Sequence, residues 1–255
     1  MNEWRRLALA LQFLTRLPVH VEAFEPTELN RCARYFPLVG ALVGAFGAAV
    51  FVIAAHWWPL PVAVGLSIAA TVWLTGGFHE DGLADTCDGL GGAVSRERAL
   101  EIMKDSRLGS YGVLGLVVTL GLKAALLLAL AQHAPLRAAL AMVFTHAASR
   151  AAAVVLLVAL PYAGDAAQAK AKPLAQRATA VELTIALGSV VLLGAAAGPT
   201  LGWPSLALAI VLAALMLAWL ARWLKRRLGG FTGDTLGATQ QCCEVALLLG
   251  LAAVL

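Results

Sequence analysis

The sequence predicts an all-α, polytopic integral membrane protein, a helix bundle of about seven spans preceded by an N-terminal interfacial amphipathic helix. Three observations support this fold class. The mean hydropathy is +0.81 and only 13% of the 255 residues are charged, against about 25% in soluble proteins. Long apolar runs recur along the chain, and Lys and Arg gather in alternate segments between them. Spans of about 20 residues fill the chain, so we expect a single membrane-embedded domain over residues 1–255.

The first expected element is an amphipathic helix over residues 4–17. Trp4, Leu7, Leu11 and Leu14 recur at helical spacing on one face, and polar residues occupy the other. Such a helix lies along the membrane surface with its apolar face in the headgroup region. It does not resemble a cleaved signal peptide, because the apolar core is short and no small-x-small cleavage site follows.

Seven apolar runs then predict the membrane spans. They cover residues 36–56, 60–78, 109–131, 137–160, 181–199, 203–223 and 235–255. The last run is the least regular, because Gln240, Gln241 and Glu244 interrupt its first half.

The distribution of Lys and Arg predicts the orientation. With a cytoplasmic N-terminus, 16 of the 19 basic residues fall in or beside cytoplasmic segments, as the positive-inside rule requires. An odd number of spans then places the C-terminus outside. The net charge of +4 therefore reflects topology and does not indicate a nucleic-acid partner. The basic residues assigned to the cytoplasmic side are Arg5, Arg6, Arg16, Arg31, Arg34, Arg96, Arg98, Lys104, Arg107, Lys170, Lys172, Arg177, Arg222, Lys225, Arg226 and Arg227.

The most informative segment for function is GGFHEDGLADTCDGLGG at 76–92. Asp81, Asp85 and Asp88 are four and three residues apart, so on a helix they share one face. Like charges this close repel one another unless a cation neutralises them, and Mg²⁺ prefers oxygen ligands that it shares with substrate phosphates. His79 adds a titratable group. The segment therefore predicts a metal site facing the cytoplasm, with a solvated acidic loop as the alternative.

A second charged segment, EIMKDSRLGSYG at 101–112, joins this motif to the third span. In one interpretation Lys104 and Arg107 bind phosphate groups while Asp105 helps to hold the metal. In the other, the segment is a surface helix with internal salt bridges. The residues alone leave both interpretations open.

A third segment, GGFTGDTLG at 229–237, leads into the last span on the same side of the membrane. Asp234 supplies a further carboxylate, which could complete the metal site or cap the last helix. Two glycine-rich acidic segments on one side of the membrane suggest a single cytoplasm-facing site.

Charged residues inside the predicted spans are the next observation. Arg150 lies near the centre of the fourth span, with His146 one turn before it on the same face. A mid-membrane arginine costs about 2.5–3.5 kcal/mol by insertion scales, so it normally faces a partner or a polar cavity. We expect Arg150 to bind phosphate or, alternatively, to pair with Glu244 or Asp234. The same two interpretations apply to Lys123, in the third span.

Five segments in order along the chain resemble the cobalamin synthase family, whose members are adenosylcobinamide-GDP ribazoletransferases. Family members usually carry an alcoholic or aliphatic residue where Phe78 and Glu80 stand, which leaves the aspartates in register. The segments that carry the resemblance are FPLVGALVG at 36–44, GGFHEDGLADTCDGLGG at 76–92, EIMKDSRLGSYG at 101–112, SR at 149–150 and GGFTGDTLGATQQ at 229–241.

The resemblance implies a Mg²⁺-dependent enzyme of the bacterial inner membrane that acts late in coenzyme B12 biosynthesis. Such enzymes join adenosylcobinamide-GDP to α-ribazole, or to its 5′-phosphate, and release GMP. It further implies roles for particular residues. The metal ligands would be Asp81, Asp85, Asp88 and Asp234; the substrate-binding residues would be Lys104, Asp105, Arg107 and Arg150; and the catalytic residues would be His79, Asp81 and Asp85, the general base being His79 or one of the aspartates.

Two other classes compete with this interpretation. A CDP-alcohol phosphotransferase acting on lipids is also polytopic and metal-dependent, but its motif requires an arginine where Asp85 stands, and a later GxxxDxxxD pattern that this chain lacks. A transporter could also use Arg150 and Lys123 inside the membrane, but the charged motifs gather on one side and no inverted repeat is apparent.

Overall fold

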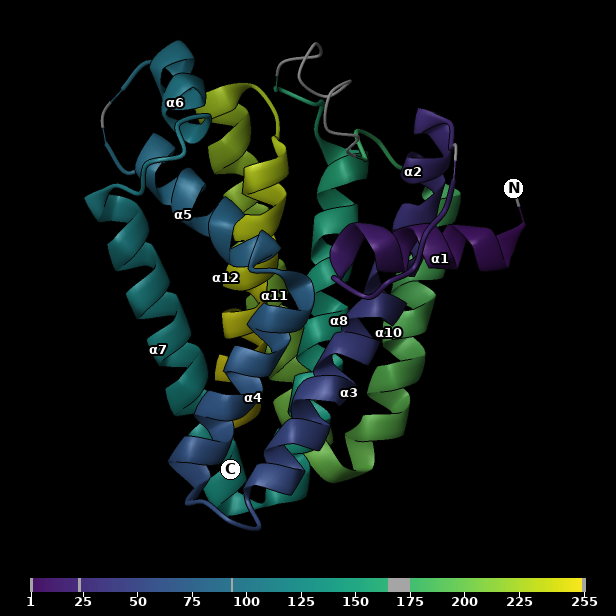
Figure 1. The fold of residues 1–255 in the computed structure, drawn as a ribbon, viewed down its shortest axis with the longest axis vertical. Helices are drawn as coiled ribbons and strands as arrows, with labels where there is room; N and C mark the ends of the chain where they lie inside the picture. The colour runs from purple at the N-terminus through teal and green to yellow at the C-terminus, as the bar shows by residue number, and fades with distance from the viewer. Residues whose placement is uncertain (1, 23, 93, 165–174, 254–255) are drawn as a thin grey trace.

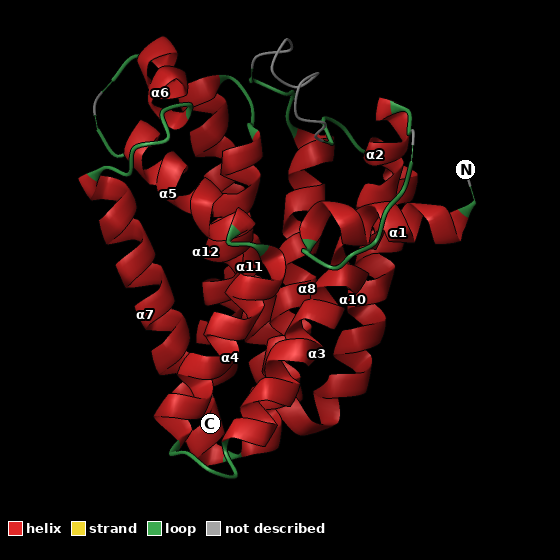
Figure 2. Ribbon diagram, in the orientation of Figure 1, coloured by secondary structure: helices red, strands yellow, loops and turns green. Residues whose placement is uncertain are grey.

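The computed structural model describes residues 2–22, 24–92, 94–164 and 175–253 as a bundle of helices (Figures 1 and 2). Within those ranges the only β-type pairing is an isolated bridge between Tyr162 and Phe231. The predicted all-α class is therefore confirmed. Lys170 and Lys172, which the topology assignment used, and the last two residues of the run 235–255 lie outside the described residues.

The N-terminal helix α1, Glu3–Leu14, lies across the bundle (Figure 1). It ends three residues before the predicted limit of 17. The side chain of Asn2 caps it by accepting a hydrogen bond from the backbone N–H of Arg5 at 3.0 Å. Leu9 and Leu14 are buried, whereas Trp4 is 80% exposed, a position suited to a membrane interface. The short helices α2, Pro26–Cys32, and η1, Ala33–Tyr35, follow it.

In the part of the chain that the structure describes, five helices are long and apolar enough to cross a membrane. All five correspond to predicted spans, with ends that differ by a few residues. They are α3, Phe36–Ala54, which forms one helical stretch with η1 and α2 back to Thr27; α7, Ser110–His133; α8, Pro135–Ala159; α10, Ala180–Leu201; and α11, Trp203–Leu228.

The second predicted span, 60–78, ends earlier than expected. Helix α4, Leu60–Thr75, is followed after two residues by α5, Phe78–Leu90, and the two axes differ by 89°. Gly76 and Gly77 form this bend with φ of +71° each, a conformation that glycine adopts without the strain that a Cβ would cause. Neither helix alone is long enough to cross a membrane, whereas the bent pair together would make a sixth span. Because α5 turns away from α4 almost at a right angle, it is not part of any of the five helices that are long enough to cross a membrane.

The last predicted span is a helix, α12, Gly233–Ala252, but it is not among the helices apolar enough to qualify as a span. It packs against α11, α5, α8 and α7, and Gln240, Gln241 and Glu244 are all buried there. A helix enclosed by other helices needs no continuous lipid-facing surface, so polar residues are tolerated along it. Figure 1 places the C-terminus at the end of the bundle opposite to α5 and to the short helix α6, Arg96–Met103.

Helix α8 forms the centre of the bundle. In its most apolar window 78% of the residues are buried, against 17% in α7 and 22% in α10 and α11. Close packing with α3 depends on Gly40 and Gly44, where a Cβ would lie 2.2 Å from the carbonyl oxygen of His146 and 2.4 Å from that of Met142. This small-xxx-small spacing lets two helix backbones approach in lipid, and it fixes α8 next to α3.

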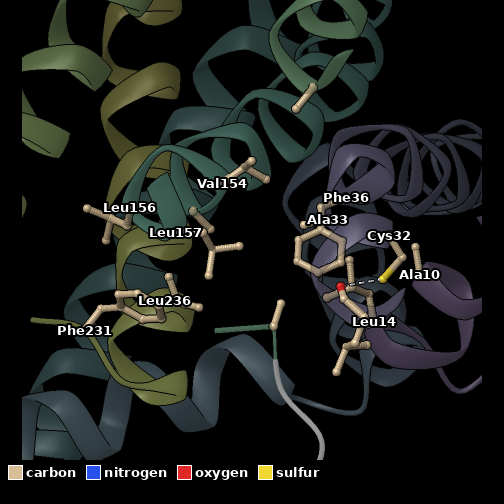
Figure 3. Packing of buried hydrophobic residues seen from close by; sticks show 14 of the residues in the cluster. Ala10, Leu14, Cys32, Ala33, Phe36, Val154, Leu156, Leu157, Phe231 and Leu236 are labelled. Carbon is tan, nitrogen blue, oxygen red and sulfur yellow. Dashed lines mark hydrogen bonds between the residues drawn. The ribbon is translucent and has the colours of Figure 1, made fainter. Parts of the chain in front are cut away.

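A buried apolar cluster joins the N-terminal helices to the rest of the bundle (Figure 3). Leu14 and Phe36 belong to its N-terminal part, and Leu157 and Leu236 come from α8 and α12. The Cys32 thiol also lies there and donates a hydrogen bond to the carbonyl oxygen of Leu29, 3.1 Å away. The cluster therefore anchors α1 and α2 to the helices that carry the buried polar residues.

Candidate active site

The three aspartates of the 76–92 segment lie on α5, as their spacing predicted. Asp81 is exposed, whereas Asp85 and Asp88 are half-buried. The bend at Gly76 and Gly77 turns this helix away from α4, so that the acidic residues lie at the end of the bundle that also carries α6 (Figure 1).

Helix α12 brings the fourth predicted carboxylate to the same place. A Cβ on Gly82 of α5 would lie 2.7 Å from the carbonyl oxygen of Asp234, and one on Gly237 of α12 would lie 3.1 Å from that of His79. The two helices therefore cross in close contact, because both lack side chains at the crossing. Thr232, rather than Asp234, is the N-cap of α12, and its side chain accepts a hydrogen bond from the N–H of Thr235.

The carboxylates of this crossing interact electrostatically. Partial burial, followed by the negative charges of Asp81, Asp234 and Asp88, raises the pKa of Asp85 to about 7. The four predicted carboxylates thus share one electrostatic environment. Within the described part of the chain, however, no three His, Cys, Asp or Glu side chains are grouped closely enough to hold a metal ion by themselves. A cation here would need further ligands from water or substrate.

Asp88 has a structural partner that its sequence position did not reveal. Its carboxylate accepts hydrogen bonds from the backbone N–H groups of Gly109, at 2.7 Å, and Gly112, at 2.8 Å. These donors lie at the start of α7, where helix N–H groups lack intrahelical partners. Asp88 therefore caps α7 and ties the segment 104–109 to the acidic end of α5.

This cap leads to a stability prediction. In Asp88→Asn, one carboxylate oxygen is replaced by an amide group that cannot accept a hydrogen bond. We expect the free energy of unfolding, measured without added divalent cations, to fall by about 1–2 kcal/mol, the usual range for a lost N-cap. Equal stability of Asp88→Asn and the wild type in the same detergent would contradict the capping role.

The segment 104–107 follows α6 and is not helical, so the alternative interpretation of a surface helix is wrong for these residues. An internal salt bridge of the expected kind occurs earlier, in α6, between Arg98 and Glu101. Asp105 receives hydrogen bonds from the guanidinium of Arg107, with Nε 3.0 Å from each carboxylate oxygen. These hydrogen bonds lower the pKa of Asp105 to about 2. Arg107 remains exposed, and Lys104 forms the C-cap of α6. The segment thus presents basic groups at the same end of the bundle as the aspartates.

His79 lies on the other side of α5 from the exposed carboxylate. It is buried, with 4% of its surface exposed, and it interacts electrostatically with Arg150, Glu244 and His146. Its side chain therefore belongs to the interior of the bundle, and a surface-bound substrate does not reach it directly in this structure.

Arg150 is also interior. Only 2% of it is exposed, and its guanidinium donates a hydrogen bond to the carbonyl oxygen of His146, at 2.9 Å, and contacts the His146 ring at 3.1 Å. The predicted proximity of His146 is confirmed. The Nε of Arg150 has no hydrogen-bond partner among the described residues. A phosphate-binding role for Arg150 would require access to this buried position.

A network of buried polar residues surrounds these two side chains. The Lys123 ammonium lies 2.6 Å from the Glu244 carboxylate, which is 3.4 Å from the His146 ring. Gln240 donates hydrogen bonds to Glu244, at 2.7 Å, and to Ser149, at 2.9 Å. Glu244 thus pairs with Lys123, although the sequence suggested it as a partner for Arg150. We name the set Lys123, His146, Ser149, Arg150, Gln240 and Glu244 the membrane charge network.

The membrane charge network is connected to the first turn of α5, which carries Glu80 and Asp81. The next residue on α12, Gln241, donates a hydrogen bond to Glu80 at 2.8 Å, and Glu80 precedes Asp81. Sequence reasoning gave no role to Gln240 or Gln241. The sequence feature that could have indicated a role for them is the polar segment TQQCCE inside an otherwise apolar run.

Comparison with known proteins gives one consistent result. Residues 6–252 match the family described as cobalamin-5-phosphate synthase. Proteins named adenosylcobinamide-GDP ribazoletransferase from Leptothrix cholodnii, Shewanella amazonensis and Polaromonas naphthalenivorans are 57%, 48% and 44% identical to the chain, respectively. The alignments cover 98%, 97% and 97% of this chain and 96%, 95% and 97% of those relatives. No solved structure matches the chain.

Proposed function

The chain belongs to the cobalamin-5-phosphate synthase family, and we propose that it is a Mg²⁺-dependent adenosylcobinamide-GDP ribazoletransferase. The substrates would be adenosylcobinamide-GDP and α-ribazole, or α-ribazole 5′-phosphate. A ribose hydroxyl of the ribazole attacks the β-phosphorus of the activated corrinoid; the new oxygen–phosphorus bond replaces the bond to GMP, which leaves, and the hydroxyl proton passes to a base. The product is adenosylcobalamin or its 5′-phosphate.

The observation that carries the proposal is the crossing of α5 and α12. It brings Asp81 and Asp85 to Asp234 from a segment about 150 residues away in the chain. Burial, and after it the negative charges of Asp81, Asp234 and Asp88, raise the pKa of Asp85, which supports a site where a bound cation would neutralise the carboxylates. Mg²⁺ usually takes one or two protein carboxylates and fills its other positions with water and substrate phosphates, so the ion would be shared between these aspartates and the diphosphate of the substrate.

Particular residues would then have particular tasks. Asp81, Asp85 and Asp234 would hold the ion, which supplies charge neutralisation for a diphosphate. Lys104 and Arg107 would orient the phosphates from the neighbouring segment, with Asp105 holding the guanidinium of Arg107 in position. Asp88 would shape the site by fixing α7 to α5. With His79 and Arg150 buried, an aspartate is the better placed general base.

We also infer the orientation in the bacterial inner membrane. The end of the bundle that carries α1, α5 and α6 would face the cytoplasm, and the C-terminus at the other end (Figure 1) would face outside. Basic residues gather in the segments at the former end, as the positive-inside rule requires. The site would therefore face the compartment that supplies nucleotides and Mg²⁺.

The direct test is GMP release by the purified protein in nanodiscs. We expect GMP and a cobalamin product only when adenosylcobinamide-GDP, α-ribazole and Mg²⁺ are all present. A parallel reaction with α-ribazole 5′-phosphate shows which nucleophile is preferred. Absence of GMP from folded protein would contradict the proposal, and CMP release from a CDP-activated lipid would instead identify a CDP-alcohol phosphotransferase.

A further inference from the structure

A cavity of about 630 Å³ lies between α1, α2, η1 and the start of α10, separate from the carboxylates of α5 and α12. Figure 1 shows α1 and α2 on one side of α8, and α5 and α6 on the other. The volume is in the range of small-molecule sites. Four of the described residues that line it are arginines: Arg6, Arg31, Arg34 and Arg177.

The lining is strongly cationic. Among the described residues that line the cavity, Glu182 is the only acidic one, so these residues carry an excess of three positive charges. Glu3 and Glu28 are not among the lining residues, but they pair with Arg6, Arg31 and Arg34. Even with Glu3 and Glu28 counted beside Glu182, the four lining arginines leave a net positive charge. An anion is therefore the ligand class that the cavity attracts.

Hydrogen bonds hold the wall in place. The side chain of Asn30 on α2 accepts hydrogen bonds from the backbone N–H groups of Gln176, at 2.9 Å, and Arg177, at 3.3 Å. Arg34 donates a hydrogen bond to Glu182 at 2.5 Å, and Glu182 in turn accepts one from the backbone N–H of Thr179, the N-cap of α10, at 3.0 Å. The segments 30–34 and 176–182 are thus fixed around one opening.

Arg34 has unused capacity to donate hydrogen bonds. Its side chain is 11% exposed, and its Nε is buried without a hydrogen-bond partner among the described residues. Buried donors are rarely left in this state. The planar guanidinium fork matches the oxygens of a phosphate group better than a point charge does, and two of the other lining arginines, Arg31 and Arg177, are exposed to an entering ligand.

We propose that this arginine cavity binds a phosphate group, as a second anion site distinct from the carboxylate site. The phosphate has two possible sources, the headgroup of an anionic phospholipid or a free phosphate-bearing solute. The cavity adjoins α1, and in the orientation proposed above an amphipathic helix at this end would lie at the depth of anionic headgroups. Both sources share the chemistry that the arginines recognise.

The test compares two double variants of equal charge. Arg31→Gln/Arg177→Gln removes the two exposed lining arginines and leaves the Arg34–Glu182 pair intact. Arg98→Gln/Arg222→Gln removes two exposed arginines from α6 and α11, outside the cavity. One arm measures retention of phosphatidylglycerol by native mass spectrometry after purification from nanodiscs of mixed phosphatidylglycerol and phosphatidylcholine. The other arm measures pyrophosphate binding to the detergent-solubilised protein by calorimetry.

We expect the cavity variant to bind at least about tenfold more weakly than the wild type, which corresponds to about 1.4 kcal/mol, and the control variant to bind like the wild type. Loss confined to the phosphatidylglycerol arm identifies a lipid headgroup, and loss confined to the pyrophosphate arm identifies a soluble ligand. Absence of binding to the wild type in both arms, or equal weakening in both variants, would overturn the proposal. Circular dichroism and elution volume verify that both variants are folded.

Discussion

Asparagine in place of Asp81 or Asp85 is expected to lower the rate of GMP release by about a hundredfold or more, while the protein still inserts and folds. Each substitution removes one negative charge and one metal-binding oxygen from the crossing of α5 and α12. Loss of ion-mediated stabilisation is worth several kcal/mol in the transition state, and each 1.36 kcal/mol changes the rate tenfold. Asp81 is exposed and Asp85 half-buried, so the fold does not depend on their charges.

The stability of these variants separates chemistry from folding. Asp85→Asn removes a carboxyl that burial and its neighbours already disfavour as an anion, so we expect its free energy of unfolding to equal or exceed that of the wild type. The matched control is Glu97→Gln, which neutralises an exposed carboxylate on α6 at the same end of the bundle, and it should retain full activity. Near-wild-type turnover in both Asp81→Asn and Asp85→Asn would exclude the carboxylate site as the place of reaction.

The required Mg²⁺ concentration gives a second readout of the same variants. If Asp81 and Asp234 hold the ion, Asp81→Asn and Asp234→Asn should both raise the Mg²⁺ concentration needed for half-maximal rate. If either residue instead serves as the general base, its substitution lowers the maximal rate without moving that concentration. The two variants therefore assign roles that spacing alone does not distinguish.

The sequence predicted the helical class and the shared face of Asp81, Asp85 and Asp88 correctly, because both follow from local periodicity. It missed the bend between α4 and α5, since apolar composition continues through the two glycines whose positive φ turns the chain. The sequence also predicted the last span from the leucines in its second half. In the structure α12 is buried among four other helices, and it can therefore carry two glutamines and a glutamate. Periodicity indicates which residues share one face of a helix, but it does not indicate which other helices pack against that face.

Residue roles were harder to predict where they depend on distant partners. Asp88 resembles its two neighbours in sequence, yet its acceptor role arises from N–H groups 21 and 24 residues away. His79 belongs to the same motif but points to the interior, where Arg150 lies. The arginines of the cavity were informative only for topology, because nothing in their spacing brings α2 to the start of α10. These placements depend on tertiary contacts, which a single sequence does not specify.

The membrane charge network leads to the largest expected effect on stability. Lys123 and Glu244 are 2% and 1% exposed, and their charged atoms lie 2.6 Å apart. Glu244→Gln would leave Lys123 and Arg150 as buried cations, with Glu80 as the remaining nearby carboxylate. Breaking a buried pair in this way costs about 3–5 kcal/mol. We therefore expect Glu244→Gln to lower the free energy of unfolding by that amount.

Replacing the other partner of this pair, Lys123, should lower the free energy of unfolding by less. In Lys123→Met, Glu244 keeps its hydrogen bond from Gln240, its contact with the His146 ring and its attraction to Arg150. The remaining anion is therefore better compensated than the cations left by Glu244→Gln. The double variant Lys123→Met/Glu244→Gln should be more stable than the sum of the single effects predicts, because neither change then leaves its partner unpaired. Lys225→Met, at an exposed lysine of α11, is the matched control.

Activity measurements on the same variants test whether the network also supports the carboxylate site. Gln240 and Gln241 are adjacent on α12; one bonds to Glu244 and the other to Glu80 of α5. A displaced α12 would shift Asp234 relative to Asp85, and we therefore expect Glu244→Gln to reduce turnover even at temperatures where it remains folded. Strictly additive stability effects across the double variant would show that Lys123 and Glu244 are not coupled. Full activity of folded Glu244→Gln would show that the carboxylate site is positioned by the close packing of Gly82 and Gly237 alone.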